Sequence, residues 1–339
     1  MFLLLLFTLV VFFLMDLALG SVKIPVDQVT SILLGQQVEN QAWQNIILKI
    51  RLPRTVTAIL VGAALSVGGL QMQTLFRNPL AGPSVLGITA GASLGVAAVM
   101  LLTGSAATTF AIRELGVGPS WLIILSSTAG AFVVLLLILG ISYRIRDNVV
   151  MLIVGIMMAN ITIAVVSIWQ YFSDPEQIQE YLLWTFGSLG GVTNYQLGVL
   201  SIIVIVGVLA TFLLSKTLNV LLLGEEYAAS MGLNVRSARL LIILVTSVLA
   251  GAITGFCGPI GFVGIAVPHL TRSVLNTSDH KQLVPAVVLV GALLMLICDI
   301  ISQVPGSATV LPVNAITALI GSPIVIWIIV KRRNLKASF

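Results

Sequence analysis

The chain has 339 residues, of which 58% are hydrophobic and 9% are charged, and its formal net charge is +5. Soluble domains usually carry about 25% charged residues, so this composition excludes a water-soluble globular protein and favours a helical protein solvated by lipid. We expect the positive charge in cytoplasmic loops, with membrane lipid around the protein and no nucleic-acid partner.

Apolar runs divide the chain into about ten membrane spans, because a helix needs roughly 20 apolar residues to cross about 30 Å of hydrocarbon. The first run, residues 1–20, has no basic segment before it and is interpreted as a span in preference to a signal peptide. We expect a single membrane domain over 1–339, whose further spans lie near 54–75, 84–103, 119–142, 148–171, 192–215, 239–257, 262–276, 282–303 and 314–331.

Segments rich in glycine and proline, at 81–95 and 255–268, interrupt this pattern. Broken helix is tolerated at membrane depth only where protein or a water-filled cavity covers it, so we expect both segments inside the protein. Each segment follows a helix rich in small residues. This arrangement predicts close helix packing and a weak internal repeat of the inverted kind.

The basic residues are unequally divided between the two sides of this topology. If both termini are cytoplasmic, twelve of the seventeen Lys and Arg residues lie on the inner side. Because cytoplasmic loops of membrane proteins are enriched in these residues, the distribution supports this orientation.

Arg51 and Arg54, in the segment "RLPRT", are two of the few basic residues on the predicted outer side. They could extend to lipid headgroups, which is the simpler alternative. They could instead receive carboxylates of an outside protein through charge-assisted hydrogen bonds. The usual bias against outer positive charge favours the second interpretation.

A polar loop at about 216–238 is long for so compact a chain and too polar to span the membrane. Within it, "EEYAASM" consists mostly of good helix formers and begins with Glu225 and Glu226, where the helix dipole favours acidic residues. Gly232 follows at the position of a C-terminal helix stop. The pattern predicts a short helix on the inner surface that either connects two spans or binds a cytosolic partner.

Few polar residues fall inside the predicted spans. Asp299 lies in "LLMLICDIISQ", where a carboxylate is costly and usually paired. A structural hydrogen bond, a part in a conformational change and a proton relay are all open for it. Asn160 and Gln170, in the fifth span, either bond a neighbouring helix or face a water-filled path.

The remaining candidates for chemistry are interpreted as structural. His269 suits a capping or packing role near an inner helix end, and Cys257 and Cys298 suit small apolar core positions. Two cysteines supply too few ligands for a metal site. The pattern GxxxxGK[ST], which cradles nucleotide phosphates, does not occur in the sequence. We therefore expect no enzymatic activity, no catalytic residue, no metal and no cofactor of its own for this chain.

Three segments, in this order, resemble the permease subunits of FecCD-type ABC importers, which serve iron–siderophores, haem and vitamin B12. They are "RLPRTVTAILVGAALSVGGLQMQTLFRNPLAGPSVLGITAGASLG", "GEEYAASMGLNV" and "GPIGFVGIAVPHLTR", and the resemblance extends from about Ile50 to Trp327. It implies an all-α polytopic membrane protein with the type II ABC importer permease fold and a short cytoplasmic coupling helix. The implied location is the bacterial cytoplasmic (inner) membrane.

The resemblance also implies the function and the partners. The chain would be the transmembrane permease subunit for an iron–siderophore or a related metal chelate, haem or cobalamin. It would work with two cytosolic ABC ATPase subunits that carry ATP-Mg, with an extracytoplasmic substrate-binding protein, and with a second permease copy or paralogue, most simply as a homodimer.

Particular residues acquire roles from the same resemblance. The polar loop would hold the coupling helix, whose coupling residues would be Glu225, Glu226, Ala228, Ala229 and Gly232. All of these except Glu225 occupy places of the loose EAA…G signature of ABC importers, and Tyr227 stands where the general signature has Ala. Arg51 and Arg54 would receive the binding protein, although a further outer basic residue used by some members has no counterpart between Asp299 and Ala318. The translocation path or gate would include Asp147, Asn148 and Asn160.

An ion-driven secondary transporter is the alternative. Inverted repeats and an intramembrane carboxylate such as Asp299 would allow it. A carrier of that kind needs no coupling helix, so the polar loop discriminates between the two.

Overall fold

The computed structural model describes residues 1–36, 40–103, 118–144, 147–307 and 309–331, and within these ranges the protein is helical and has no β-strand. In chain order the α-helices are α1 (Phe2–Ala18), α2 (Val26–Leu33), α3 (Gln41–Asn45), α4 (Leu52–Leu75), α5 (Ile88–Ala97), α7 (Pro119–Arg144), α8 (Asn148–Phe172), α9 (Pro175–Thr185), α10 (Asn194–Leu213), α11 (Ser215–Leu221), α12 (Glu225–Ser230), α13 (Val235–Cys257), α14 (Val263–Leu275), α15 (His280–Ser302) and α16 (Val313–Lys331). Turns of π-helix form η1 (Ile46–Arg51) and η3 (Ala98–Thr103), and a 3₁₀ turn forms η2 (Pro83–Leu86).

Each of the ten predicted spans coincides with a helix of the structure. Among the described residues, six helical segments are long and apolar enough to cross a membrane, and they correspond to α4, α7, α8, α10, α13 and α15. Shorter apolar helices occupy the predicted spans at α1, α5 and α16. The predicted span 262–276 corresponds to α14, which has 13 residues and contains Pro268.

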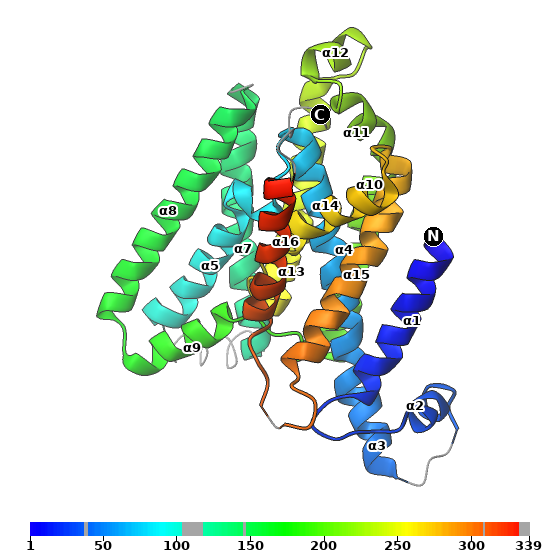
Figure 1. Ribbon diagram of the computed structural model, residues 1–339. Helices are drawn as coiled ribbons and strands as arrows, with labels where there is room; N and C mark the ends of the chain where they lie inside the picture. Colours follow the sequence, from blue (N-terminus) through cyan, green and yellow to red (C-terminus); the bar gives the residue numbers. More distant parts are fainter. Residues whose placement is uncertain (37–39, 104–117, 145–146, 308, 332–339) are drawn as a thin grey trace.

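The helices run between two ends of the molecule (Figure 1). At one end lie α11, α12 and the start of α8, and the N-terminal end of α1 points the same way. At the opposite end lie the short helices α2, α3 and α9. The predicted inner loop and the predicted outer segments are therefore at opposite ends of the bundle.

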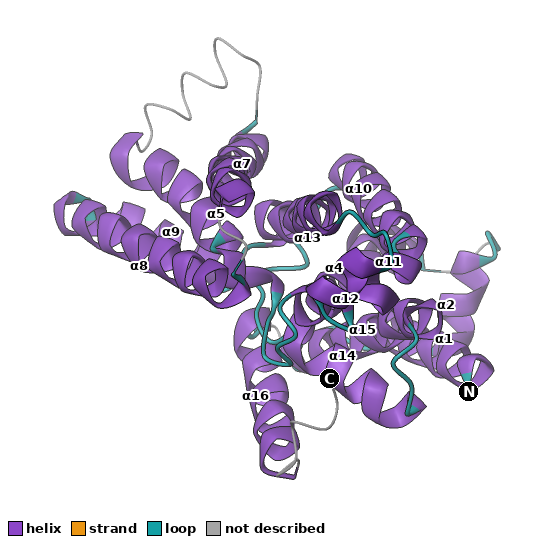
Figure 2. Ribbon diagram, turned by 90° about the horizontal axis from the view of Figure 1, so that it is seen from above, coloured by secondary structure: helices purple, strands orange, loops and turns teal. Residues whose placement is uncertain are grey.

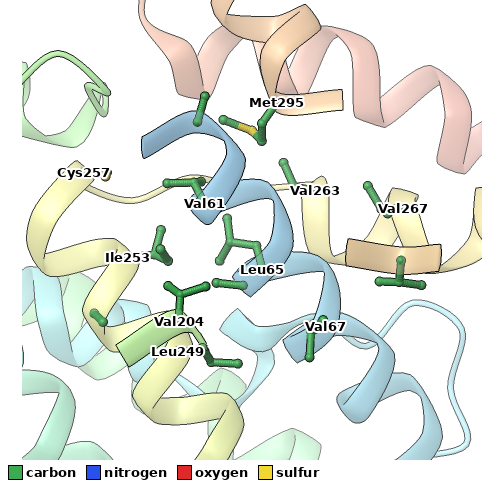
Figure 3. Packing of buried hydrophobic residues seen from close by; sticks show 14 of the residues in the cluster. Val61, Leu65, Val67, Val204, Leu249, Ile253, Cys257, Val263, Val267 and Met295 are labelled. Carbon is green, nitrogen blue, oxygen red and sulfur yellow. The ribbon is translucent and has the colours of Figure 1, made fainter. Parts of the chain in front are cut away.

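Helix α4 forms the centre of one group of helices. Gly62 and Gly69 bring its backbone against its neighbours, because a Cβ at these positions would overlap the carbonyls of Gly291 on α15 and Gly264 on α14. Close backbone contact through small residues is how membrane helices pack without polar side chains. Around these contacts lies an apolar cluster that includes Val61, Leu65, Val204, Leu249, Ile253, Val263 and Met295 (Figure 3).

A second group consists of α5, α7 and α8. A Cβ at Gly130 on α7 would overlap the carbonyl of Gly91 on α5, and one at Gly155 on α8 would overlap the carbonyl of Val85 in η2. Seen from above, this group lies to one side of the molecule, α1, α10 and α15 lie to the other, and α13 lies between them (Figure 2). Helix α13 packs against both α4 and α7.

The two glycine- and proline-rich segments are inside the protein, as predicted. Pro83 and Leu86 in η2 are buried, and so are Val263 and Gly264 at the start of α14. Phe262, which precedes α14, has a φ of 65°, a left-handed conformation that non-glycine residues rarely adopt. The internal repeat stays a prediction.

Candidate coupling and docking sites

Helix α12 has the ends that the sequence predicts. Gly224 precedes it with a φ of 104°, and Gly232 follows it with a φ of 86°, a region that glycine enters without strain. The Gly232 amide donates to the Ala229 carbonyl at 3.0 Å, and the Leu233 amide donates to the Ala228 carbonyl at 3.0 Å. These bonds satisfy carbonyls that the short helix would otherwise leave open.

One face of α12 is buried and the rest is exposed. Ala228 is fully buried, in one cluster with Leu218 and Leu221 of α11. Glu226, Tyr227 and Ala229 are exposed, together with Met231 and Gly232 after the helix. The helix stands clear of the long helices at the end of the bundle (Figure 1). Alanine at position 228 therefore allows α12 to lie close to α11 while its other face stays open.

Glu225 anchors α12 to the start of α13. Both of its carboxylate oxygens accept hydrogen bonds from Arg239 Nη2, at 2.6 and 2.7 Å, and the side chain of Arg239 is only 5% exposed. Charge-assisted bonds of this kind are among the stronger ones in proteins. Of the predicted coupling residues, Glu225 thus faces the protein and Glu226 faces outward.

A cavity of about 490 Å³ lies between α12, the start of α13 and the end of α7. Its wall includes Tyr143, Glu226 and Arg236. The guanidinium carbon of Arg236 lies 3.2 Å from the ring centre of Tyr143, and Arg236 Nη2 donates to the Tyr143 carbonyl at 3.3 Å. This cation–π contact joins the polar loop to the C-terminal end of α7.

The predicted gate residues lie along α8. The Asp147 side chain caps the helix by accepting from the backbone amides of Val149, at 2.7 Å, and Val150, at 3.2 Å. Asn148 is the first residue of α8, and its side chain lies outside the described part of the structure. Asn160 is exposed on a helix most of whose surface is open in the single chain. Their part in a path or gate stays a prediction.

At the opposite end of the bundle, Arg51 is buried, with 5% of its surface exposed. Its guanidinium donates to the carbonyls of Leu17, at 2.6 Å, and Ala18, at 3.1 Å, and also to that of Val22. These acceptors lie at and just after the C-terminal end of α1, where helix carbonyls lack partners. The side chain holds α1 against η1, and a docking role for it stays a prediction.

Arg54 forms an ion pair with the carboxylate of Asp299, the intramembrane acid that the sequence singles out. Arg54 Nε and Nη2 lie 2.9 and 2.7 Å from Asp299 Oδ1, and Nη2 also reaches Ser302 Oγ at 3.2 Å. The Asp299 side chain is fully buried and that of Arg54 is 14% exposed. The geometry favours the structural role for Asp299, because its charge is paired as buried charges usually are.

A second carboxylate, Asp16 on α1, belongs to the same network. Gln303 Nε2 donates to both acids, to Asp16 Oδ1 at 3.1 Å and to Asp299 Oδ2 at 3.0 Å. Thr55 Oγ1 donates to Asp16 Oδ2 at 2.6 Å. The network ties α1, α4 and α15 together beneath a cavity of about 200 Å³ whose wall includes Arg51, Arg54 and Gln303.

Two further polar clusters, one buried and one partly buried, were not predicted from the sequence. Gln71 on α4 donates to Thr211 Oγ1 at 2.8 Å and accepts from Thr246 Oγ1, which links α4 to α10 and α13. Near α12, Asn219 on α11 is bonded to His280, the first residue of α15. In the sequence these side chains are polar residues within or at the edge of apolar runs, a pattern that does not reveal their partners.

The other candidates for chemistry are placed inside helices. His269 in α14 and the free cysteines Cys257 and Cys298 are buried. Ser93 lies in a GxSxG pattern, but it is within α5 and its hydroxyl donates to the Thr89 carbonyl at 3.0 Å, unlike a nucleophile on a strand–helix turn. Over the described ranges, no three His, Cys, Asp or Glu residues are grouped so that they could hold a metal ion.

Known proteins resemble this chain over nearly its whole length. The FecCD transport family matches residues 8–331. The hemin transport system permease protein HmuU of Yersinia pestis is 36% identical over 94% of this chain and 93% of its own length. The vitamin B12 import system permease protein BtuC of Klebsiella pneumoniae is 36% identical over 86% of this chain and 84% of its own.

The fold is also that of a solved transporter. A structure described as a metal-chelate type ABC transporter in an inward-facing conformation superposes with a TM-score of 0.84, at 27% identity, over 97% of this chain and 98% of the other. The match in sequence and the match in fold both extend over the ten helices that coincide with the predicted spans. This chain therefore belongs to the FecCD transport family.

Proposed function

We propose that this protein is the transmembrane permease subunit of an ABC importer that moves an iron–siderophore or a related metal chelate, such as haem or cobalamin, across the bacterial cytoplasmic membrane. The observation that carries the proposal is α12, a short helix outside the bundle, in a chain of a family whose relatives are hemin and vitamin B12 permeases. An independent carrier would have no use for such a helix.

The energy for transport would come from two cytosolic ABC ATPase subunits that bind ATP-Mg. Their docking site would be the exposed face of α12, with Glu226, Ala229 and Gly232 in contact with the ATPase. Glu225 and Ala228 would hold the helix in place from behind, through Arg239 and α11. ATP would drive transport because it binds better to one arrangement of the permease halves than to the other.

A substrate-binding protein would dock at the end that carries α2, α3 and α9. Arg54 is the better placed of the two predicted docking residues, because part of its side chain opens onto the outer cavity while Arg51 is occupied with carbonyls. A second permease copy would cover the open side of α8, in which only 22% of the apolar span is buried within this chain. Both chain termini would then be cytoplasmic, with α12.

The test is uptake by the purified importer in proteoliposomes. The permease is reconstituted with its ATPase and binding protein, and radiolabelled haem, cobalamin and a ferric siderophore are offered one at a time. We expect ATP-dependent uptake of one of them that stops when the P-loop lysine of the ATPase is changed. Uptake driven by an ion gradient without the ATPase would refute the proposal and favour the secondary transporter.

A further inference from the structure

A partly buried polar joint, formed by Asn219, Asp279 and His280, connects the α11–α12 segment to the core of the bundle. Its centre is Asn219 on α11, whose side-chain amide lies against the N-terminal turn of α15. Asn219 Oδ1 accepts from the backbone amide of His280 at 2.8 Å and lies 2.8 Å from His280 Nδ1. Asn219 Nδ2 donates to Asp279 Oδ1 at 2.6 Å.

These contacts fix the proton on the His280 ring. Because Asn219 Oδ1 can only accept, Nδ1 must carry the hydrogen. The other ring nitrogen, Nε2, lies 2.8 Å from the hydroxyl of Thr74, in the last turn of α4. His280 is fully buried, so its ring is held between Asn219 on one side and α4 on the other.

The remaining partner, Asp279, is fixed by the same amide. It caps α15 by accepting from the Lys281 amide at 3.0 Å. The hydrogen bond from Asn219 lowers the pKa of Asp279 below its ordinary value, followed by the bond from the Lys281 backbone. Asn219 therefore meets an ionised carboxylate, which strengthens the contact.

The joint ends on two closely packed helices, α4 and α15. Helices α4 and α15 are in backbone contact at Gly62 and Gly291, so they must move together. Helix α11, which carries Asn219, is in turn packed directly against α12, because Leu218 and Leu221 of α11 share a buried cluster with Ala228 of α12. A displacement of α12 thus reaches α4 through one helical turn and one amide.

We propose that Asn219 is a positioning residue that transmits movement of α12 to the α4–α15 pair through His280 and Thr74. This inference rests on the proposed function, since it supposes that an ATPase moves α12. The joint sets how far ATP hydrolysis is converted into transport, and it is separate from the surface that binds the ATPase.

The experiment compares four forms of the reconstituted importer for ATP hydrolysis and for substrate transported per ATP. Asn219→Leu removes the bonds to His280 and Asp279 at similar volume. Asn219→Asp keeps the acceptor for His280 but sets two carboxylates against each other. The double change Asn219→Asp/Asp279→Asn exchanges amide and carboxylate. It keeps the acceptor for His280 and restores a hydrogen bond between the two side chains, but an amide nitrogen at position 279 cannot also accept from the backbone amide of Lys281. Gln282→Leu, an exposed amide in the same turn of α15, is the matched control.

We expect Asn219→Leu and Asn219→Asp to hydrolyse ATP but to move about tenfold less substrate per ATP, a typical size for coupling between sites. The double change should restore the ratio, and Gln282→Leu should leave it unaltered. If Asn219→Leu does not assemble, the comparison of Asn219→Asp with the double change decides alone.

Two results would contradict the positioning role proposed for Asn219. In one, the variants lose thermal stability while substrate per ATP stays at the value of the unaltered protein, which would make the contact structural only. In the other, the double change fails to recover the ratio. Absence of ATP-dependent uptake by the unaltered importer would instead refute the proposed function, and the joint with it.

Discussion

Removing one partner of the Arg54–Asp299 pair should be far more costly than removing both. In Arg54→Met, Asp299 keeps the hydrogen bond from Gln303 but loses its bidentate cation, and it has no exposed surface through which water could compensate. Breaking a buried ion pair on one side costs about 3–5 kcal/mol. We expect about 3 kcal/mol here, because Gln303 still donates to the carboxylate.

The double change Arg54→Met/Asp299→Leu should recover most of this loss, since well-packed apolar residues often replace a buried pair at little cost. The loss of stability in Arg54→Lys should be intermediate between that of Arg54→Met and that of the double variant, because an ammonium keeps the charge but not the bidentate geometry. The assay is the free energy of unfolding of the purified permease in detergent, from denaturant titrations at constant lipid. The reasoning fails if Arg54→Met loses less than about 1 kcal/mol, or if the double variant is as unstable as the single one.

Three other predictions concern separate parts of the molecule. Glu226→Arg on the open face of α12 should leave the fold intact and reduce co-purification of the ATPase by about tenfold, and unchanged recovery on an affinity column would contradict the proposed docking face. Gly69→Ala should cost about 3 kcal/mol, the upper end of the usual cost of overpacking, because its Cβ would overlap the Gly264 carbonyl, whereas Gly191→Ala, with open space around it, should be neutral in the same unfolding assay. Arg51→Met should loosen α1, because the Leu17 carbonyl loses its side-chain donor and the Ala18 carbonyl keeps only the Ile24 amide, so hydrogen exchange at the end of α1 should rise relative to that of α4.

The sequence predicts those features of the fold that depend on local composition. The length of each span follows from its apolar run. The end of α12 follows from Gly232, because glycine adopts the left-handed conformation without strain. The short span of α14 was also foreseeable, because Pro268 and the glycines before it limit a regular helix. The all-helical class and the membership of the FecCD family are confirmed.

What the sequence does not predict is the pairing of polar residues over long separations. Arg54 and Asp299 are 245 positions apart, and one was assigned to docking while the other had three open roles. Arg51 is a similar case, because its partners are backbone carbonyls, which every residue possesses and no pattern distinguishes. Asn219 and His280 each lie at the edge of an apolar run, and only the packing of α11 against α15 brings them together.

Two of the contacts that the polar loop makes with the bundle differ in strength, and this difference bears on how the permease moves. Arg236 and Tyr143 meet on the surface, where a cation–π contact is worth about 0.5–1 kcal/mol, so α7 can part from the loop at little cost. Asn219 and His280 meet where the ring is fully buried and the amide is half-buried, and leaving a buried polar group without its partner costs about 1–3 kcal/mol. A displaced α12 should therefore carry α4 and α15 with it before it carries α5 and α7. Since α13 lies between the two groups, the first movement in the bundle should be a shift of the α4 group against the α7 group along the faces of α13.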